Sequence, residues 1–269
     1  MNKLQEKLLS MLTWFDSFCR ENKLRYFILG GTMLGAARHK GFIPWDDDID
    51  VGMPREDYER FCKQVGNQLI EHFFVETVQS TDPAYSYTYT KIFDTNTTLI
   101  ENIKEKLIRG VFLDVFPLDG IGDSEKEARR LYFKLSAKLN FYSTRVCAIR
   151  KGRSWWKNLA VYIMSGLPII NNRALRINID RTCKKRDYDA SKWVGNLMGA
   201  WGFKELMPKS IMGKPREYCF EGLKVFGAED FDGYLTHLYG DWRKLPPKDK
   251  QISHHDYLYM NLQKSYLED

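Results

Sequence analysis

The sequence predicts an α+β fold, in which a mixed sheet with helices forms a core and a helical region extends from it. Apolar residues recur at helical spacing near the N-terminus, and short runs rich in β-branched and aromatic residues follow up to residue 116. From Ser124 onward the texture changes to long helical segments rich in Lys and Arg. We therefore expect a core over residues 1–123, a helical extension over 124–220, and a C-terminal segment, 221–269, that packs back on the core.

The first half of the chain is predicted to alternate helices and strands. Leu4, Leu8, Leu12, Phe15 and Cys19 lie at helical spacing, which predicts an amphipathic helix over residues 3–21. The remaining segments are a strand over 25–29, a helix over 32–39, a strand over 48–53 that Pro54 ends, a helix from about 58 to 69, and strands over 73–78, 85–93 and 111–116.

The second half is predicted to begin with three long helices. They span roughly 124–150, 154–166 and 171–188. The last third mixes short elements around many aromatic residues, and it contains Tyr239-Gly240-Asp241-Trp242 and Leu245-Pro246-Pro247.

The composition is that of a globular protein, with 43% hydrophobic and 28% charged residues. The net charge of +6 suits an anionic substrate such as a nucleotide or a polyphosphate polymer. The five cysteines are scattered and form no C-x-x-C pair, which argues against a disulfide framework or a zinc site and favours a reducing cytoplasm. The first 20 residues lack the features of a signal peptide, and no apolar stretch reaches the ~18 residues that would span a bilayer.

A dense acidic run, Trp45-Asp46-Asp47-Asp48-Ile49-Asp50-Val51, begins one of the predicted strands. Side chains alternate along a strand, so Asp48 and Asp50 are predicted to share one face. Two neighbouring carboxylates repel each other unless a cation lies between them, and Mg²⁺ is held by one or two carboxylates plus water and substrate oxygens. We therefore expect a catalytic divalent metal here, Mg²⁺ or Mn²⁺, rather than an acidic surface turn.

A calcium loop of the EF-hand type is the other interpretation of this run. Asp46, Asp48 and Asp50 have its 1-3-5 spacing, but Val51 stands where the loop needs glycine and Pro54 falls inside it. That interpretation fails.

A small-residue turn, Gly30-Gly31-Thr32, precedes the acidic run and follows a predicted strand. Gly-Gly after a strand is often only a turn, but backbone N–H groups at a helix start can bind an anion and Thr32 adds a hydroxyl. The sequence lacks both G-x-x-x-x-G-K-[ST] and G-x-G-x-x-G, which excludes a P-loop enzyme and a dinucleotide-binding fold.

A third carboxylate and two basic residues complete the predicted site. Asp114, in an apolar run where a lone charge would be costly, is the expected third carboxylate; a core aspartate paired with Arg109 or another base is the alternative. Asp119 is expected in a turn before Gly120. Arg38 and Lys91 could neutralise a diphosphate, although Lys91 could equally be a snorkelling surface lysine.

Two further motifs are weaker. His254-His255-Asp256 resembles a catalytic or metal cluster but is more typical of a capped loop. Trp155-Trp156-Lys157, with an apolar run behind it and basic residues before it, could lie at an anionic membrane surface; a buried helix of the extension is the favoured interpretation.

These motifs together resemble the signature of the LicD family. The matching run contains Gly30-Gly31-Thr32, Gly35, Arg38-His39 and Gly41-Phe42-Ile43-Pro44-Trp45-Asp46-Asp47-Asp48-Ile49-Asp50. Downstream blocks resemble the family at Lys91-Ile92, Asp94, Asn96-Thr97, Leu113-Asp114-Val115-Phe116-Pro117, and Tyr239-Gly240-Asp241-Trp242 with Leu245-Pro246-Pro247. The stretch from about 124 to 220 matches nothing, and Trp242 stands where the family often has another aromatic residue.

The resemblance implies a nucleotidyltransferase-like mixed-sheet core, related to fukutin and fukutin-related protein. It implies that Asp48, Asp50 and Asp114 are the catalytic and metal-binding carboxylates, and that the glycine turn with Thr32 contacts the nucleotide phosphates. The family transfers phosphocholine onto bacterial cell-surface polymers. The zinc-binding cysteines of the animal relatives have no counterpart in this sequence.

The resemblance also implies the reaction: metal-dependent transfer of phosphocholine from CDP-choline to a hydroxyl of a teichoic acid or lipopolysaccharide type of glycopolymer, releasing CMP. The alternatives are another CDP-alcohol donor, a nucleotidyltransferase, or a non-catalytic polymer- or nucleic-acid-binding module. Choline would be expected in an aromatic cage, for which Trp45, Trp201 and Trp242 are unassigned candidates. We expect a cytoplasmic enzyme, with peripheral contact at the inner face of the membrane, a lipid-linked or anionic acceptor and no nucleic-acid partner.

Overall fold

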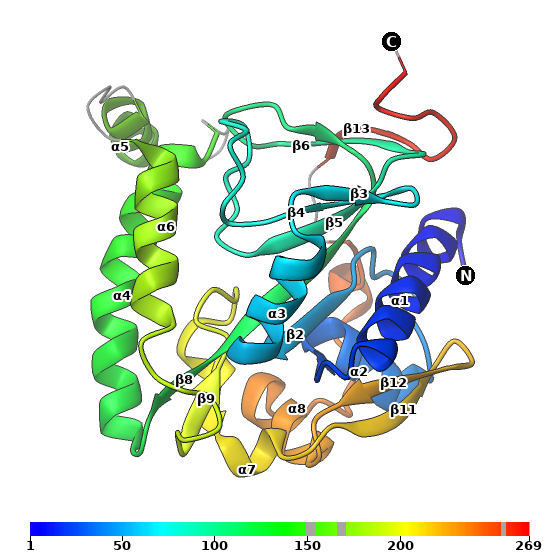
Figure 1. Ribbon diagram of the computed structural model, residues 1–269, viewed down its shortest axis with the longest axis vertical. Coiled ribbons are helices and arrows are strands. Elements are labelled where there is room, and N and C mark those ends of the chain that lie inside the picture. The colour runs from blue at the N-terminus through cyan, green and yellow to red at the C-terminus, as the bar shows by residue number, and fades with distance from the viewer. Residues whose placement is uncertain (149–153, 166–170, 254–256, 269) are drawn as a thin grey trace.

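The computed structural model describes residues 1–148, 154–165, 171–253 and 257–268 (Figure 1). A twisted sheet crosses the middle of the molecule, with α1 on one side and the long helices α4 and α6 side by side at the other. The described α-helices are α1 (Lys3–Glu21), α2 (Gly30–His39), α3 (Arg55–Val65), α4 (Glu125–Val146), α5 (Trp155–Ser165), α6 (Asn172–Cys183), α7 (Lys209–Met212) and α8 (Phe231–Tyr239).

The central sheet is mixed, which confirms the predicted α+β fold. Its strands run in the order β1 (Phe27–Ile28), β2 (Asp50–Pro54), β8 (Phe112–Gly122), β5 (Thr90–Asp94), β4 (Phe73–Glu76) and β3 (Gln68–Ile70). β2 and β8 are parallel, and the other pairs are antiparallel. The long strand β8 continues beyond β2 and β5 and pairs there with β9 (Trp193–Gly195), which in turn pairs with β10 (Leu206–Pro208).

Two smaller sheets lie against this one. Their strands are β11 (Arg216–Phe220) with β12 (Leu223–Gly227), and β6 (Thr98–Glu101) between β7 (Ile108–Arg109) and β13 (Tyr257–Asn261).

The predicted helices of the first half are confirmed with small shifts at their ends. α1 matches residues 3–21, and Asn2 caps it by accepting the N–H of Gln5 while the Gln5 side chain binds the Asn2 N–H. α2 starts at Gly30 itself, two residues earlier than expected. α3 ends at Val65, and the chain then turns into β3, so the predicted helix up to residue 69 was too long.

The predicted strand over 85–93 is wrong in its first half. β5 begins only at Thr90, because the preceding tyrosines form a packed loop. The Tyr85 hydroxyl lies within hydrogen-bond distance of the carbonyls of Glu76 and Tyr89, and the Arg176 guanidinium donates to the Tyr85 carbonyl. Side-chain hydrogen bonds from distant segments therefore hold the backbone of this loop in place of strand pairing.

The helical extension has its own small core. α4 and α6 pack together with the end of β8 and the β9–β10 hairpin, around Leu135, Tyr142, Ile179 and Leu206. Strands β9, β10 and β11 fall within the predicted helical extension, 124–220, and β9 pairs directly with β8. The three-part division of the chain stays a prediction.

A buried ion-pair network ties this extension to the main sheet. Asp119 was expected in a turn, but it lies in β8, fully buried, because it receives both arms of the Arg55 guanidinium at 2.7 and 2.8 Å. A third nitrogen of Arg55 donates to Asp180 on α6 at 2.7 Å. The five cysteines, all in the described part of the chain, form no disulfide. Among the described helices, none combines the length and apolar content that crossing a bilayer requires.

Candidate active site

A cavity of about 260 Å³ lies where β2 begins and α2 starts. Four carboxylates line it: Asp48, Asp50, Asp114 and Glu205. The rest of its wall includes Gly30 and Gly31, two aromatic residues of the sheet region, Tyr89 and Phe116, and a later segment that contributes Asn196 and residues 198–201. The three aspartates predicted from the sequence are therefore brought together.

Asp50 and Asp114 are cross-strand neighbours. Asp50 is the first residue of β2, and its register partner on the parallel strand β8 is Asp114. Adjacent strands are about 4.8 Å apart and register partners point to the same face, so the two carboxylates must lie close together. The next strand places Lys91 in register with Asp114.

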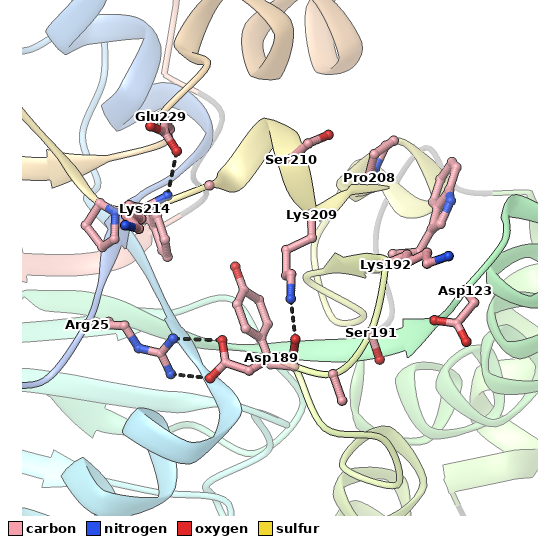
Figure 2. Close-up of a pocket in the computed structure, with 16 residues that line it drawn as sticks. Arg25, Asp123, Asp189, Ser191, Lys192, Pro208, Lys209, Ser210, Lys214 and Glu229 are labelled. Atoms are coloured by element: carbon pink, nitrogen blue, oxygen red, sulfur yellow. Dashed lines mark hydrogen bonds and ion pairs between the residues drawn. The ribbon is translucent and has the colours of Figure 1, made fainter.

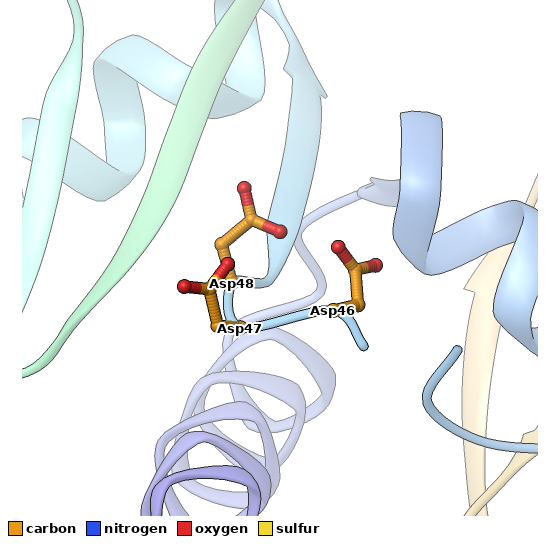
Figure 3. Close-up of side chains that lie close together, drawn as sticks. All are labelled: Asp46, Asp47 and Asp48. Atoms are coloured by element: carbon orange, nitrogen blue, oxygen red, sulfur yellow. The ribbon is translucent and has the colours of Figure 1, made fainter. Parts of the chain in front are cut away.

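Asp48 does not lie in a strand, which corrects the alternation argument. β2 starts at Asp50, so Asp46, Asp47 and Asp48 belong to the loop before it, as Figure 3 shows. Their carboxylates come within 4.8 Å of one another. Gln5 of α1 donates to the Asp46 carbonyl at 3.1 Å and so ties this acidic loop to the helix. The loop carries Asp48 into the same cavity as Asp50 although their backbones differ.

The glycine turn supports the acidic strand from the other side. Gly30 has a φ of +49°, a left-handed conformation that favours glycine, and its N–H donates to the Tyr234 hydroxyl on α8. A Cβ on Gly31 would come within 2.8 Å of the Asp46 carboxylate. Thr32 is buried, and its hydroxyl accepts the N–H of Asp50 at 3.0 Å. Contact of Gly30, Gly31 and Thr32 with phosphate stays a prediction.

Asp114 is only partly neutralised. The Lys91 ammonium lies 3.0 Å from its Oδ1 and the Tyr89 hydroxyl donates to its Oδ2 at 3.3 Å, yet Oδ1 receives no hydrogen bond of acceptable geometry and is fully buried. Burial raises the pKa of Asp114 to about 6, although the positive charge of Lys91 lowers it. The alternative was a core aspartate paired with Arg109 or another base. Arg109 pairs instead with Glu76 and Asp82, but the base that pairs with Asp114 is Lys91.

Asp50 carries the larger electrostatic strain. Burial raises its pKa well above the usual value, and the negative charges of Asp48, Asp114 and Glu205 raise it further. A divalent cation held by these carboxylates would relieve this repulsion. Carboxylate oxygens are also the ligands that Mg²⁺ prefers, so the residues present fit that ion.

The two basic residues predicted to bind the diphosphate do not line the cavity. Lys91 is only 1% exposed, so the alternative of a snorkelling surface lysine is wrong. Its ammonium instead faces Asp114 and, at 3.7 Å, Glu101. Arg38 lies in the last turn of α2, where it donates to His39 and to the Trp242 carbonyl. A role in diphosphate binding stays a prediction for both.

Glu205 is the site residue that the sequence reasoning missed. It ends a short 3₁₀ helix, Gly202–Glu205, before β10. Its Oε1 accepts the N–H of Trp201 at 3.0 Å, and burial raises its pKa to about 7. No local motif marks it, and the chain brings it to the cavity because β9 pairs with the far end of β8 and β10 pairs with β9.

The three candidate tryptophans differ in their position relative to the cavity. Trp201 lines the cavity and is half exposed, at 49%. Trp242 is buried, and its indole N–H donates to Asp232. Trp45 packs against the main core. The motif His254-His255-Asp256 lies outside the described residues.

A larger cavity, of about 810 Å³, lies at the opposite end of β9 (Figure 2). Arg25 and Asp189 pair across it through two hydrogen bonds of 2.8 Å, and Lys209 donates to the Asp189 carbonyl. It contains none of the predicted site residues and no cluster of like charges, so size does not identify the active site here.

Comparisons with known proteins identify the family of this chain. The model of the LicD/FKTN/FKRP nucleotidyltransferase domain matches residues 23–146, which include all three aspartates. The chain is similar to the lipopolysaccharide cholinephosphotransferase LicD of Haemophilus influenzae, at 32% identity over 250 residues and 92% of each chain. It is also similar to human ribitol 5-phosphate transferase FKRP, at 50% identity over 42 residues that make up 16% of this chain and 8% of that protein. The 32% identity over 92% of both chains, together with the domain match over residues 23–146, shows that this protein belongs to the LicD family of transferases.

Proposed function

We propose that this protein transfers phosphocholine from CDP-choline to a hydroxyl group of a cell-surface glycopolymer and releases CMP. The observation that carries the proposal is the cavity in which Asp48, Asp50 and Asp114, from three separate positions in the chain, converge. The relative that matches over 92% of its length is named as a lipopolysaccharide cholinephosphotransferase, which supports the choice of donor and acceptor.

Asp48, Asp50 and Asp114 would hold Mg²⁺ or Mn²⁺. When bound, such an ion stabilises negative charge on the oxygens of a diphosphate. The protein's own part is positioning: Thr32 fixes the start of β2 through the Asp50 N–H, and the register of β2 with β8 keeps the two carboxylates adjacent. An acceptor oxygen would attack the phosphorus that carries choline, and the bond from that phosphorus to the CMP oxygen would break.

The acceptor hydroxyl must lose a proton in this reaction, and Asp114 can take it. With a pKa of about 6, its carboxyl is mostly ionised near neutral pH and is still a better base than an ordinary aspartate. Lys91 keeps it ionised by its positive charge. If all of its oxygens are bound to metal, Asp114 is a ligand and not the base.

A panel of donors tests the substrate. Purified protein would be incubated with Mg²⁺ and with CDP-choline, CDP-ribitol, CDP-glycerol or CTP, and CMP and pyrophosphate would be measured. CMP release from CDP-choline supports the proposal. Release from another CDP-alcohol alone would favour a transferase related in specificity to FKRP, and pyrophosphate from CTP would favour a nucleotidyltransferase.

A double variant separates an enzyme from a binding module. Asp48→Asn, Asp50→Asn removes two carboxylates while it preserves their shape, and it should abolish CMP release. The matched control is Asp230→Asn, Asp232→Asn, which alters two acids at the start of α8, outside the cavity lining. Full activity of the cavity variant would rule out the metal mechanism.

The helical extension supports peripheral contact with a membrane, where a lipid-linked acceptor would lie. The favoured expectation of a buried helix is wrong for α5, because five large side chains at one helical spacing are exposed: Trp155, Trp156, Leu159, Tyr162 and Ile163. Between Glu127 and Asp180 the sequence has eleven lysines and arginines and no acidic residue. An apolar helical face within a basic region suits an anionic lipid surface. Such a contact would place the protein at the cytoplasmic face of the membrane.

Flotation with vesicles tests this contact. The protein should float with phosphatidylglycerol vesicles, and Leu159→Glu with Ile163→Glu should leave it in the soluble fraction. Leu267→Glu is the matched control, because Leu267 is exposed far from α5 in the sequence. A wild-type protein that stays soluble would remove the membrane contact without affecting the proposed chemistry.

A further inference from the structure

We infer that Trp201 and Glu205 form the part of the cavity that binds the quaternary ammonium group of the donor and so select choline over an uncharged alcohol. The inference rests on the proposed function and adds what that proposal lacks, namely the residues that recognise the headgroup. We call these two residues and the chain between them the headgroup wall.

The charge of the cavity favours a cationic ligand. The residues that line it include four carboxylates and, within the described chain, no lysine, arginine or histidine. A single divalent ion on the strand aspartates leaves at least one negative charge, and Glu205 comes from a different part of the fold. This fourth carboxylate would repel the phosphates of the donor unless the donor also carries a positive group.

Aromatic rings supply the second element of ammonium recognition. Trp201 is half exposed, and its ring meets the edge of Tyr239 with the centroids 5.0 Å apart, which fixes the indole beside the cavity. Tyr89 and Phe116 contribute another pair of rings, 4.3 Å apart, to the same lining. Cations are attracted to such ring faces within about 6 Å of the centroid, most strongly by Trp.

Glu205 is held in place as a recognition group would be. Its Oε1 accepts the Trp201 N–H at 3.0 Å, so the carboxylate and the indole belong to one rigid turn. Gly199 permits this arrangement, since a Cβ there would lie 1.9 Å from Oε1. Among the described residues, no basic nitrogen comes within 4.0 Å of this carboxylate to form an ion pair. The nearby Lys204 ammonium donates to the Leu238 carbonyl instead, and Lys204 is not among the lining residues.

This environment penalises a neutral ligand. Burial raises the pKa of Glu205 to about 7, and hydrogen bonds from the Trp201 backbone and the Asn196 side chain offset only part of this effect. A quaternary ammonium cannot donate a hydrogen bond, but it supplies the missing charge and an apolar surface for the rings. A polyol such as ribitol offers neither, so the headgroup wall discriminates by charge and not only by size.

The cavity size limits what is enclosed. Sites that enclose a drug-sized ligand measure about 300–1,000 Å³, and this one, at about 260 Å³, is smaller. It therefore suits the reacting phosphate with its headgroup, while the nucleoside lies outside it.

A pair of isosteric donors tests the inference directly. CDP-choline would be compared with its uncharged carbon analogue, CDP-3,3-dimethylbutanol, in which a tert-butyl group replaces the trimethylammonium group. Steady-state CMP release would be measured with each donor for wild type, Glu205→Gln, Trp201→Leu and the exposed control Glu125→Gln. Circular dichroism and Tm would establish that each variant is folded.

Wild type should prefer CDP-choline, and Glu205→Gln and Trp201→Leu should each lower that preference by roughly tenfold or more, the size of a desolvated ion pair or cation–π contact. The loss should appear as a higher KM for CDP-choline, with KM for the neutral analogue unchanged. An equal loss of kcat with both donors and a weaker dependence on Mg²⁺ would instead make Glu205 a metal ligand and overturn the inference.

Failure of this inference differs from failure of the proposed function. If wild type uses CDP-choline but neither substitution changes the preference, the headgroup is recognised elsewhere and the proposed function stands. If wild type releases CMP only from CDP-ribitol or CDP-glycerol, the proposed function fails with its donor, whatever the variants do.

Discussion

Asp114 and Asp119 lie on the same strand, are both buried, and have opposite surroundings. Asp119 receives two hydrogen bonds from Arg55, which also binds Asp180, so each of its oxygens has a partner. Asp114 has one lysine and one long tyrosine hydrogen bond, its buried Oδ1 receives no hydrogen bond, and its side chain lines a cavity with three other acids. Because they are five residues apart, they also point to opposite faces of β8.

The difference separates a structural ion pair from a functional one. A buried carboxylate whose oxygens all have hydrogen-bond partners has no capacity left for a ligand. A buried carboxylate with an unpartnered oxygen carries a desolvation free energy that a ligand can offset. Burial raises the pKa of both groups, so burial alone does not distinguish them. The distribution of partners does.

Removing one carboxylate at a time and measuring activity tests the difference between Asp114 and Asp119 most directly. Asp114→Asn should lower kcat by about 10³-fold or more, because both the metal site and the proton acceptor are lost. Asp119→Asn, measured per folded molecule, should stay within about tenfold of wild type. Equal losses for the two variants would show that the division into structural and functional carboxylates is wrong.

Thermodynamic stability should rank the two variants in the reverse order. Asp119→Asn leaves the buried Arg55 without its main partner, which should cost about 3–5 kcal/mol of unfolding free energy. Asp114→Asn should cost less, because it removes a charge that repels Asp50 and leaves the buried Lys91 ammonium 3.7 Å from Glu101. Urea unfolding without metal measures both.

A second substitution supplies the control for this stability prediction. If the lost partner is the cause, then Arg55→Met in the Asp119→Asn background should recover part of the loss. A double variant that is less stable than the single one would contradict that explanation.

The pH dependence of stability should distinguish the wild type from Asp114→Asn. The folded-state pKa of Asp114, about 6, exceeds the unfolded value, so its contribution is fully present below about pH 4 and is lost as pH rises through about 6. The difference in unfolding free energy between the two proteins should therefore change in favour of Asp114→Asn over this range. Saturating Mg²⁺ should restore wild-type stability at higher pH and stabilise the variant less, because the variant keeps only two of the three carboxylates. A flat difference would contradict the raised pKa.

The smallest expected effect concerns Lys91, the one base beside Asp114. Lys91→Met removes the charge that lowers the Asp114 pKa, so the acidic limb of the rate profile should move up by about one pH unit. Activity near pH 6 should fall several-fold and recover near pH 8. Loss of activity at every pH would instead indicate a direct role of Lys91 in binding the diphosphate.

Local patterns in the sequence were sufficient for much of the fold and for the acidic centre. The helical spacing of Leu4 to Cys19 predicted α1 within its observed bounds, because an amphipathic face is a local property. The D-x-D pair and the charged residue in an apolar run marked Asp48, Asp50 and Asp114, since such charges are costly without a cation. Strand limits were less accurate, as at Tyr85 and Asp48, where side-chain partners from distant segments decided the backbone.

The residues that surround the acidic centre became known from the tertiary structure and not from local sequence patterns. Periodicity could not show that Asp119 meets Arg55, or that Lys91 is buried beside Asp114, because both depend on the pairing of strands far apart in the chain. Glu205 reaches the cavity because β9 pairs with β8 and β10 pairs with β9, and nothing in its local sequence indicates this. The sequence by itself thus determined which acids would need a cation, because charge and burial tendency are local. The structure determined which carboxylates remain open to one, because that depends on partners brought by the fold.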